Sequence, residues 1–415
     1  MSTRLFIALV ASVALSSAPA SAQSRSSDSP LTLRAAVAEA LERNPDLRAV
    51  RAEYEAARIA PNRERYLPPP MLETQIWAWP VTTASPAKAE MYMFMAEQEL
   101  PGRGKRAARV GVAEREAEIA RQEISVRAVT VLAQVRTAFV DLAFARDQRG
   151  LYDAQRRLLE DLAEAATVRY AGGQGGQHHT VASLVELTRL EKERITADER
   201  VAVTEARLNQ LLGRQVGQSI EPIEAGASTV NEATAVATAT VGHADVAAAE
   251  AQIAREEAEL ARLRGERRPD FVVGGGYMLM PGEAGAWTAR AGVTWPNAPW
   301  SRGRLTAAID AQVRRIEAAK VRRDVVITRI RHEIRQIAVR VEAAQRQVAL
   351  IESTVLPQVE HAFELARVAY AGGEGEFTEV LESRRLLLTT QLELVEARAA
   401  VSRAFADLES AVGLL

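Results

Sequence analysis

The stretch Arg169-Tyr170-Ala171-Gly172-Gly173 recurs in this 415-residue sequence as Ala369-Tyr370-Ala371-Gly372-Gly373, 200 residues later. The same offset relates further identical residues on both sides of the two copies, without a gap. These pairs include Glu160 and Glu360, Glu164 and Glu364, Val168 and Val368, Gly175 and Gly375, Ser183 and Ser383, Leu187 and Leu387, Leu208 and Leu408, and Gly213 and Gly413. A series of this length, with the glycines in register, indicates an internal duplication.

Upstream of these matches, the two halves correspond at an offset of 199 residues. Asn44-Pro45-Asp46 aligns with His243-Ala244-Asp245, and Gly104 aligns with Gly303. The two halves therefore correspond over most of the chain.

We expect a first repeat over residues 23–213 and a second over 242–415. The segment 214–241 between them is rich in Ala, Thr, Ser and Gly, a composition typical of a linker or a loosely ordered segment. Within each repeat, the hydrophobic pattern predicts the order helix, two strands, very long helix, turn and helix.

The first long helix is expected over 102–170, which contains no proline after Pro101. Its small apolar residues recur at steps of three and four, a spacing typical of long helices packed side by side. They are Val110, Ala113, Ala117, Ala120, Ile124, Ala128, Val131, Val135, Ala138 and Leu142. Such a helix spans on the order of 100 Å. The second long helix, 303–370, contains Pro357, where we expect a kink or local unwinding. The helices after the turns are expected over 178–213 and 377–412.

Strands are expected over 69–80, 89–100, 269–280 and 285–296. In the last of these, an apolar face is bracketed by Trp287 and Trp295, and Thr288, Arg290 and Thr294 share the other face. This pattern is typical of an outer-membrane strand with aromatic girdles at both interfaces. Because an open four-stranded sheet leaves its edges unsatisfied in lipid, we expect copies of the chain to share one barrel. The alternative is two soluble β-hairpins on a helical scaffold.

Composition excludes several classes of function. The net charge is −2, so bulk electrostatics do not indicate a nucleic-acid partner, and there is no cysteine for a disulfide or thiolate site. Histidine is scarce, with five residues, and Gly274-Gly275-Gly276 lies in an expected strand rather than before a helix, so it is not a phosphate loop. We expect neither catalysis nor a cofactor.

The N-terminus is typical of a cleaved export signal. Arg4 precedes the apolar stretch 5–15, and Ala20-Ser21-Ala22 offers a cleavage site before Gln23. The alternative is a buried N-terminal helix. No later segment approaches about 20 continuous apolar residues, so we expect no transmembrane helix, and the absence of cysteine excludes a lipid anchor on Cys.

The layout resembles the TolC family of outer-membrane efflux proteins over nearly all of the mature chain. The resemblance is carried by the two Tyr-Ala-Gly-Gly turns and by three further motifs. These are Leu212-Gly213, Val412-Gly413 and Gln98-Glu99-Leu100-Pro101-Gly102-Arg103-Gly104-Lys105. It implies a mainly α protein with a membrane β part. Three protomers, each with four strands, would complete a 12-stranded β-barrel in outer-membrane lipid on a long periplasmic α-helical barrel. It also implies a passive exit duct that meets a periplasmic adaptor at the helical tips and is energised by an inner-membrane RND pump.

The resemblance also suggests site residues. The adaptor-contact tips would be Tyr170, Gly172, Gly173, Tyr370, Gly372 and Gly373, although the glycines also serve simply as turn residues. The pore constriction would be a carboxylate ring of Glu379 and Glu382; the alternative is a solvated helix face. The family's acid-to-arginine latch maps onto His179 and Gly375, so it does not transfer.

The Pro-Gly-x-Gly-Lys stretch, Asn44-Pro45 and the short C-terminus are most similar to the CzcC- and CusC-like heavy-metal branch. The strand regions contain six methionines, which suit soft ions but on alternating strand positions more often pack or face lipid. They are Met71, Met91, Met93, Met95, Met278 and Met280. We expect His178 and His179 to be an exposed pair, and no metal site is predicted. The alternatives are a duct for drugs or a secreted protein and, in another class, a soluble periplasmic scaffold or adaptor.

Overall fold

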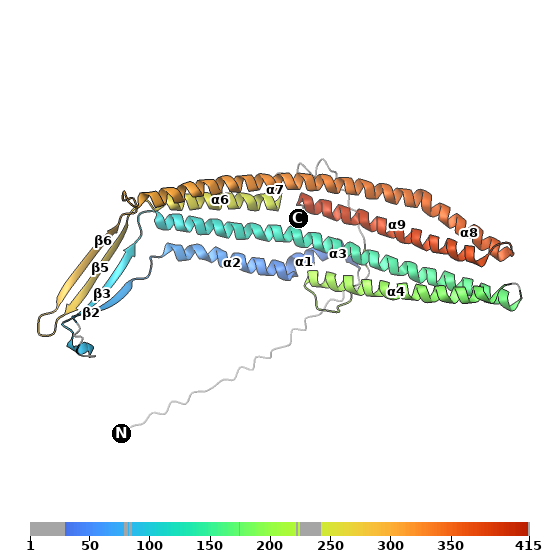
Figure 1. Ribbon diagram of the computed structural model, residues 1–415, viewed down its shortest axis with the longest axis horizontal. Helices are drawn as coiled ribbons and strands as arrows, with labels where there is room; N and C mark the ends of the chain where they lie inside the picture. The colour runs from blue at the N-terminus through green and yellow to red at the C-terminus, as the bar shows by residue number, and fades with distance from the viewer. Residues whose placement is uncertain are drawn as a thin grey trace, which may run out of the picture.

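The computed structural model describes residues 30–78, 82, 85–173, 175–220, 223–224 and 242–413. The expected signal peptide lies outside these residues, and so does most of the expected linker. Within the described part, a four-stranded sheet lies at one end of the molecule, and two helical hairpins end at the other (Figure 1).

The two repeats have the same order of elements. The first contains α2 (Pro45–Arg65), β2 (Met71–Trp77), the 3₁₀ helix η1 (Pro86–Lys88), β3 (Met91–Leu100), α3 (Lys105–Ala171) and α4 (Gln177–Leu212). The second contains α6 (Ala244–Gly265), β5 (Asp270–Leu279), β6 (Ala286–Thr294), α7 (Arg302–Leu350), the π-helical turn η2 (Ile351–Val355), α8 (Leu356–Gly372) and α9 (Phe377–Val412). Before the first repeat proper lie β1 (Leu31–Thr32) and α1 (Leu33–Arg43), and β1 pairs in parallel with β4 (Ile223–Glu224).

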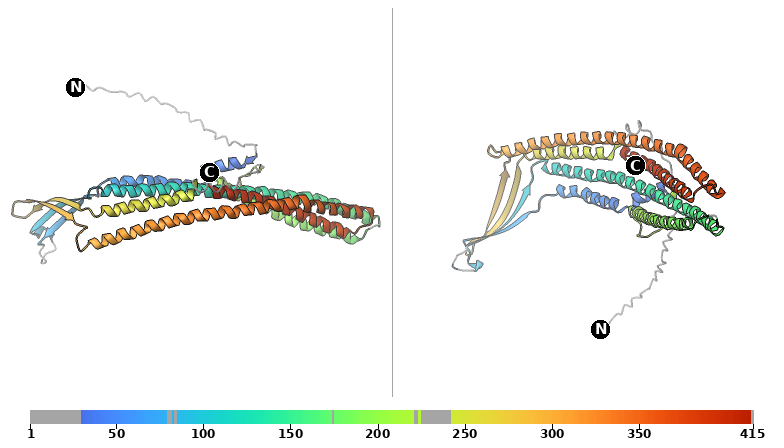
Figure 2. Two further views of the ribbon diagram at one scale, coloured as in Figure 1. Left: turned by 90° about the horizontal axis from the view of Figure 1, so that it is seen from above. Right: turned by 45° about the vertical axis from the view of Figure 1, so that its right-hand side comes forward.

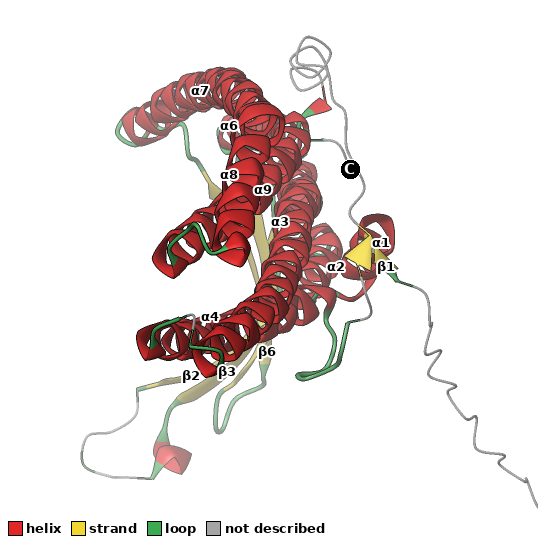
Figure 3. Ribbon diagram, turned by 90° about the vertical axis from the view of Figure 1, so that its right-hand side faces the viewer, coloured by secondary structure: helices red, strands yellow, loops and turns green. Residues whose placement is uncertain are grey.

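The helices form one curved layer, as the end-on view in Figure 3 shows. The central helix α3 packs against α2 and α4 along one side and against α6 and α9 along the other, and α7 packs against α6 and α9 (Figure 1). Many buried side chains of α3 are small or branched: Val112, Ala113, Ala117, Ala128, Val131, Leu132, Val135, Ala138 and Leu142. The core is therefore a set of narrow seams between neighbouring helices.

By length and composition alone, α3 contains an 18-residue stretch that could cross a membrane, with a mean hydropathy of 1.5. This stretch was not predicted from the sequence, because charged residues interrupt its apolar residues. Half of this stretch is buried within the protein, and α3 as a whole packs against α1, α2, α4, α6 and α9. We therefore read it as the core of the helical layer.

Equivalent residues begin the first helix of each repeat. The Asn44 carboxamide oxygen accepts hydrogen bonds from the backbone N–H groups of Asp46 and Leu47 at 3.0 and 3.2 Å. Its amide nitrogen also donates to the carbonyl of Leu211, at the end of the last helix of the repeat, at 2.8 Å. In the second repeat, His243 Nδ1 accepts from the N–H of Asp245 at 3.1 Å. The offset of 199 thus aligns two helix caps.

The second long helix contains a π turn, and the first does not. Pro357, near the start of α8, has no N–H, and its ring would clash with the carbonyl of Ser353 in a regular α-helix. The π turn η2 lies across that position. The local unwinding expected at Pro357 takes this form, and α8 bends away from the direction of α7 (Figure 2).

The π turn also marks a change in the alignment of the repeats. Before it, buried positions of the two long helices correspond at an offset of 199: Ala117 and Ile316, Val131 and Ile330, Val135 and Ile334, Ala138 and Ile337, Leu142 and Val341. Beyond it, buried Leu159 and Val359 correspond at an offset of 200. The π turn therefore accommodates the one extra residue of the second long helix.

The strand order in the sheet is β2-β3-β5-β6, and all neighbours are antiparallel. Directly opposite residues share a face, which sorts the side chains into two sets. One face is mainly apolar and carries Leu72, Ile76, Tyr92, Phe94, Phe271, Val273, Tyr277, Leu279, Trp287 and Val293, together with Thr74 and Gln98. The other carries Met71, Glu73, Gln75, Met93, Met95, Glu97, Glu99, Met278, Thr288, Arg290 and Thr294. Trp77, Met91 and Val272 also lie on this second, mainly polar face. The first face is suited to lipid and the second to a lumen.

The glycine run in β5 makes room on the polar face. Glu97, Gly274 and Arg290 lie in one row across three strands, and the Arg290 guanidinium reaches the Glu97 carboxylate at 2.6 Å. A Cβ atom on Gly274 would lie 2.9 Å from Glu97 Cγ. Glycine at this position therefore allows a charged pair to form across the middle strand.

Candidate functional site

The two hairpin turns have the same backbone geometry. Gly173 and Gly373 have positive φ values of 71° and 83°, in the left-handed region that favours glycine. Gly172 has a φ of −80°, and Gly372 is the last residue of α8. The second glycine of each pair therefore has a backbone conformation that favours glycine, whereas the first has one that other residues also adopt.

The two tip tyrosines differ in exposure. Tyr170 is 47% exposed, whereas Tyr370 is 5% exposed. The Tyr370 ring packs against Phe377, with the centroids 5.2 Å apart, and lies edge-on to His179 at 6.2 Å. Of the expected adaptor-contact tyrosines, only Tyr170 presents its side chain to the surface of the tip.

A cluster of side chains joins the two hairpins just inside the tips. The Arg169 guanidinium of α3 lies 4.7 Å from the centroid of the Tyr370 ring and donates to the Tyr370 carbonyl. His179 of α4 stacks on Phe377 of α9 at 5.2 Å. Burial lowers the pKa of His179, with the charge of His178 acting in the same direction. The prediction of an exposed histidine pair therefore holds for His178 and is wrong for His179, which is half-buried.

A second link lies further from the tips. The carboxylate of Glu186 in α4 is buried and accepts hydrogen bonds from Arg385 of α9 at 2.5 and 3.1 Å. Arg384, also buried, lies 3.6 Å away, and Arg189 donates at 3.1 Å. Hydrogen bonding to Arg385 is the main reason why the pKa of Glu186 is lowered. The sequence alone did not predict this link, because Glu186 and Arg385 are 199 residues apart and neither lies at the family's latch positions.

Glu379 and Glu382 lie on one side of α9, one helical turn apart, and both are exposed. Glu382 faces Arg385, whose pKa is raised mainly by its hydrogen bond to Glu186 and, more weakly, by the Glu382 charge. Both carboxylates are therefore accessible on the surface of the single chain.

Tryptophans mark both ends of β6. Trp287 is 83% exposed and lies 5.1 Å from the ring of Tyr277. Trp295 follows β6 directly, and its ring lies 6.1 Å from that of Trp300. Trp300 is 84% exposed and was not among the expected girdle residues, although it is only five positions from Trp295.

The Gln98–Lys105 stretch joins the sheet to the helices. Lys105 is fully buried, and its ammonium group lies 2.6 Å from Asp270 and 3.0 Å from Glu266. The N–H of Gly102 donates to Asp270 at 2.8 Å, and a Cβ atom on Gly102 would lie 2.3 Å from the carbonyl oxygen of Pro269. This motif therefore connects the two repeats at the base of the sheet.

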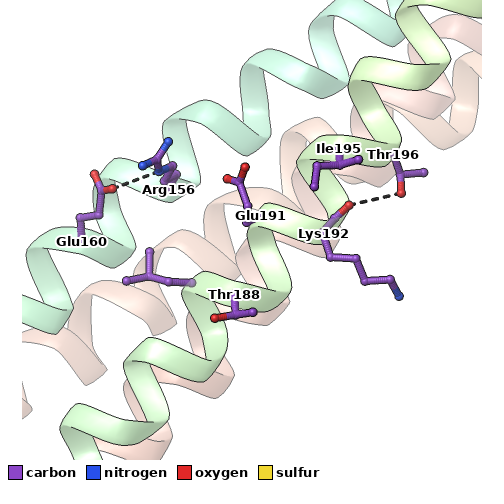
Figure 4. Close-up of a pocket in the computed structure, with 8 residues that line it drawn as sticks. Arg156, Glu160, Thr188, Glu191, Lys192, Ile195 and Thr196 are labelled. Carbon is purple, nitrogen blue, oxygen red and sulfur yellow. Dashed lines mark hydrogen bonds and ion pairs between the residues drawn. The ribbon is translucent and has the colours of Figure 1, made fainter.

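Figure 4 shows an open polar groove of about 610 Å³ between α3 and α4. Arg156 pairs with Glu160 at 3.0 Å, and Thr196 donates to the carbonyl of Lys192. These are contacts within single helices, typical of solvated helix faces. Among the described residues, no group of three or more His, Asp and Glu side chains could hold a metal ion.

The profile of the family described as outer membrane efflux protein matches residues 36–214 and 235–414, one segment in each repeat. The chain belongs to the outer membrane efflux protein family. It is 26% identical to the cobalt-zinc-cadmium resistance protein CzcC of Cupriavidus metallidurans over 374 residues, which cover 89% of this chain and 86% of the relative. These findings confirm the resemblance to the TolC family and its heavy-metal branch.

Solved structures of outer-membrane channels have the same fold. The TM-score is 0.74 with a membrane protein from Pseudomonas aeruginosa, at 17% identity, covering 92% of this chain and 90% of that one. The TM-score with VceC from Vibrio cholerae is 0.72, at 18% identity, covering 92% of this chain and 96% of VceC. The TM-score with CusC is also 0.72, at 16% identity, covering 92% of this chain and 91% of CusC. The efflux protein is thus mainly α with a β part, as predicted, and is a subunit of an outer-membrane efflux channel.

Proposed function

We propose that this chain forms, as a homotrimer, the passive exit duct of a tripartite system that exports heavy-metal cations. The observation that carries the proposal is the sheet. One of its faces is apolar, and its outer strands β2 and β6 each have one strand neighbour among the described residues. In lipid these edges require partners, and three copies would supply them as a 12-stranded barrel.

The other parts of the proposal follow from placing the sheet in the outer membrane. Export by a cleaved signal peptide would leave Gln23 as the first mature residue, without a lipid anchor on Cys. Trp287 and Trp295 would lie in the two membrane interfaces. The helical layer would extend into the periplasm, where the turns at Gly172-Gly173 and Gly372-Gly373, with Tyr170, meet the adaptor, and an RND pump in the inner membrane supplies the energy.

The duct is tested with the purified protein. We expect a heat-sensitive trimer in detergent that conducts ions in planar bilayers. Recovery of the protein in the soluble periplasmic fraction would overturn the proposal and favour a periplasmic scaffold or adaptor.

We propose that Glu379 and Glu382 of three protomers form a cation-binding ring. Changing both residues to Gln should weaken block of the channel by multivalent cations, because adjacent carboxylates attract a counter-ion jointly. Glu199→Gln, on the exposed surface of α4, is the matched control. Unchanged block in the double variant would show that these side chains do not line the constriction.

Metal cations are the proposed cargo because the relative CzcC is a cobalt-zinc-cadmium resistance protein. Deletion of the gene should lower tolerance to zinc, cobalt, cadmium or copper. If tolerance to dyes and antibiotics were lost while metal tolerance stayed unchanged, drug efflux would replace metal efflux as the function. Loss of a secreted protein from the medium would indicate type I secretion instead.

A further inference from the structure

The sulfur atoms of this chain are concentrated in one region. The sequence has seven methionines and no cysteine. All methionines other than Met1 lie in or directly beside the sheet: Met71, Met91, Met93, Met95, Met278 and Met280. More than 300 residues of helix and connecting segments contain none. A residue used only as flexible packing material would be expected in the helical seams as well.

The register places all of these side chains except Met280, which follows β5, on the polar face of the sheet. Met93 on β3 lies directly opposite Met278 on β5, and Met95 lies two residues further along the same face. The face suited to lipid is the opposite, apolar one, so Met93, Met95 and Met278 meet the other part of the expectation: they are half-buried and pack on the polar face.

Three of the thioethers lie within reach of one ion. Directly opposite residues have Cβ atoms about 5 Å apart, and diagonal neighbours are about 7–8 Å apart, distances that long methionine side chains can bridge. Met95 extends over Gly276, where a Cβ atom would lie 2.9 Å from Met95 Cγ. Met93, Met95 and Met278 are each half-buried, so they lie against the sheet.

We propose that Met93, Met95 and Met278, the methionine patch, bind a soft monovalent cation such as Cu(I) or Ag(I) inside the barrel. The inference rests on the proposed function, because closure of the barrel turns this face to the lumen. Thioethers are soft, neutral ligands that select such ions. The nearby carboxylate of Glu97 is paired with Arg290. On the same face, Glu73 lies directly opposite Met95, and Gln75 lies directly opposite Met93. The three thioethers are the soft donors of the patch, and Glu73 adds a negative charge that attracts a cation.

Flanking methionines extend the patch toward the end of the sheet away from the helices. Met91 begins β3, and Met280 directly follows β5. Successive sites of similar, moderate affinity allow an ion to enter and leave. The patch would therefore slow and select soft ions in transit rather than store them.

The test uses silver nitrate in chloride-free nitrate buffer, with the full-length trimer in detergent and in planar bilayers. The variant M93L/M95L/M278L removes the three thioethers and nearly conserves side-chain volume. F94L is the control, because Phe94 lies between Met93 and Met95 on β3 but on the opposite, apolar face. Met71 is unsuitable as a control, because it is itself a diagonal neighbour of Met95. Equilibrium dialysis measures bound silver, and single-channel recording measures the current with and without silver.

We expect the triple variant to bind silver at least about tenfold more weakly than the wild type and to lose silver-dependent block, while F94L behaves as the wild type. Equal silver affinity in wild type and triple variant would overturn the inference and leave the duct intact if both conduct normally. Absence of conductance in every form would instead overturn the proposed function, whatever the dialysis shows.

Discussion

Lys105, at the start of α3, shows how much can depend on one residue. Its ammonium group is buried between Asp270 and Glu266, at the point where the sheet meets the helices. Without Lys105, Asp270 keeps the hydrogen bond from the Gly102 N–H. Glu266 likewise keeps its pairing with Arg262. The cost is therefore that of a lost charged hydrogen bond, about 1.5–3 kcal/mol. We expect Lys105→Met to lower the unfolding free energy by this amount, measured as loss of the heat-resistant form in detergent.

The internal duplication supplies the control for Lys105. Arg304 occupies the equivalent position at the offset of 199 and is exposed, so Arg304→Met should change stability by less than about 0.5 kcal/mol. Equal effects of the two substitutions would contradict the assigned role of Lys105.

His243 gives the second repeat a pH-sensitive helix cap. Burial holds its pKa below the usual value, despite the nearby Asp245 carboxylate, so neutral Nδ1 can accept the hydrogen bond that caps α6. The unfolded chain, with a histidine pKa near 6.5, takes up a proton more readily. The contribution of His243 to stability is therefore present above about pH 6.5 and is lost as the pH falls toward its folded-state pKa.

His243→Asn places the residue of the first repeat, Asn44, in the second. It should retain the cap and make the thermal midpoint less sensitive to pH between about 7.5 and 5.5, followed by circular dichroism. If the wild type and the variant lost stability in parallel over this range, His243 would not be the titrating group.

At the scale of elements, the hairpin turns depend on one glycine each. Gly373→Ala should destabilise the α8–α9 turn by about 1–2 kcal/mol, because a Cβ atom is unfavourable at a φ of 83°. Gly372→Ala should instead stabilise the protein by about 0.5–1 kcal/mol, because Gly372 is helical and has open space around it. Thermal unfolding of the two variants distinguishes them, and a shift in the same direction would contradict this reading.

The elements themselves could be predicted to a large extent from the sequence. Apolar residues at steps of three and four are a local signal, and α3 lies at Lys105–Ala171 where a helix was expected over 102–170. The alternation of apolar and polar residues is also a local signal, and it correctly predicted which residues share each face of β6. The register between strands was not predictable locally, so the methionines could not be assigned to a face until β3 and β5 were seen side by side.

At the scale of the whole molecule, the α3–α4 and α8–α9 hairpins are joined near the tips through Arg169 and Glu186. Hydrogen bonds to charged groups contribute about 1.5–3 kcal/mol each. Their loss should let the hairpins separate. In the assembled duct, we expect Arg169→Met combined with Glu186→Gln to give a clearly larger single-channel conductance than either substitution alone.

Arg367→Met is the control for this prediction, because Arg367 pairs with Glu364 within α8. Unchanged conductance in the double variant would show that these contacts do not hold the tips together. The sequence alone could not have predicted them, because Arg169 and Tyr370 are 201 residues apart and neither lies at the family's latch positions.

The π turn at Ile351–Val355 has a consequence for the history of the gene. After an ancestral half was copied, a single codon was gained in one copy or lost in the other. In a regular helix, the change would have rotated every later side chain by about 100° and turned the hairpin tip away from its partners. One widened turn accommodates the extra residue of the second copy, so the two tips keep the same orientation whichever copy changed.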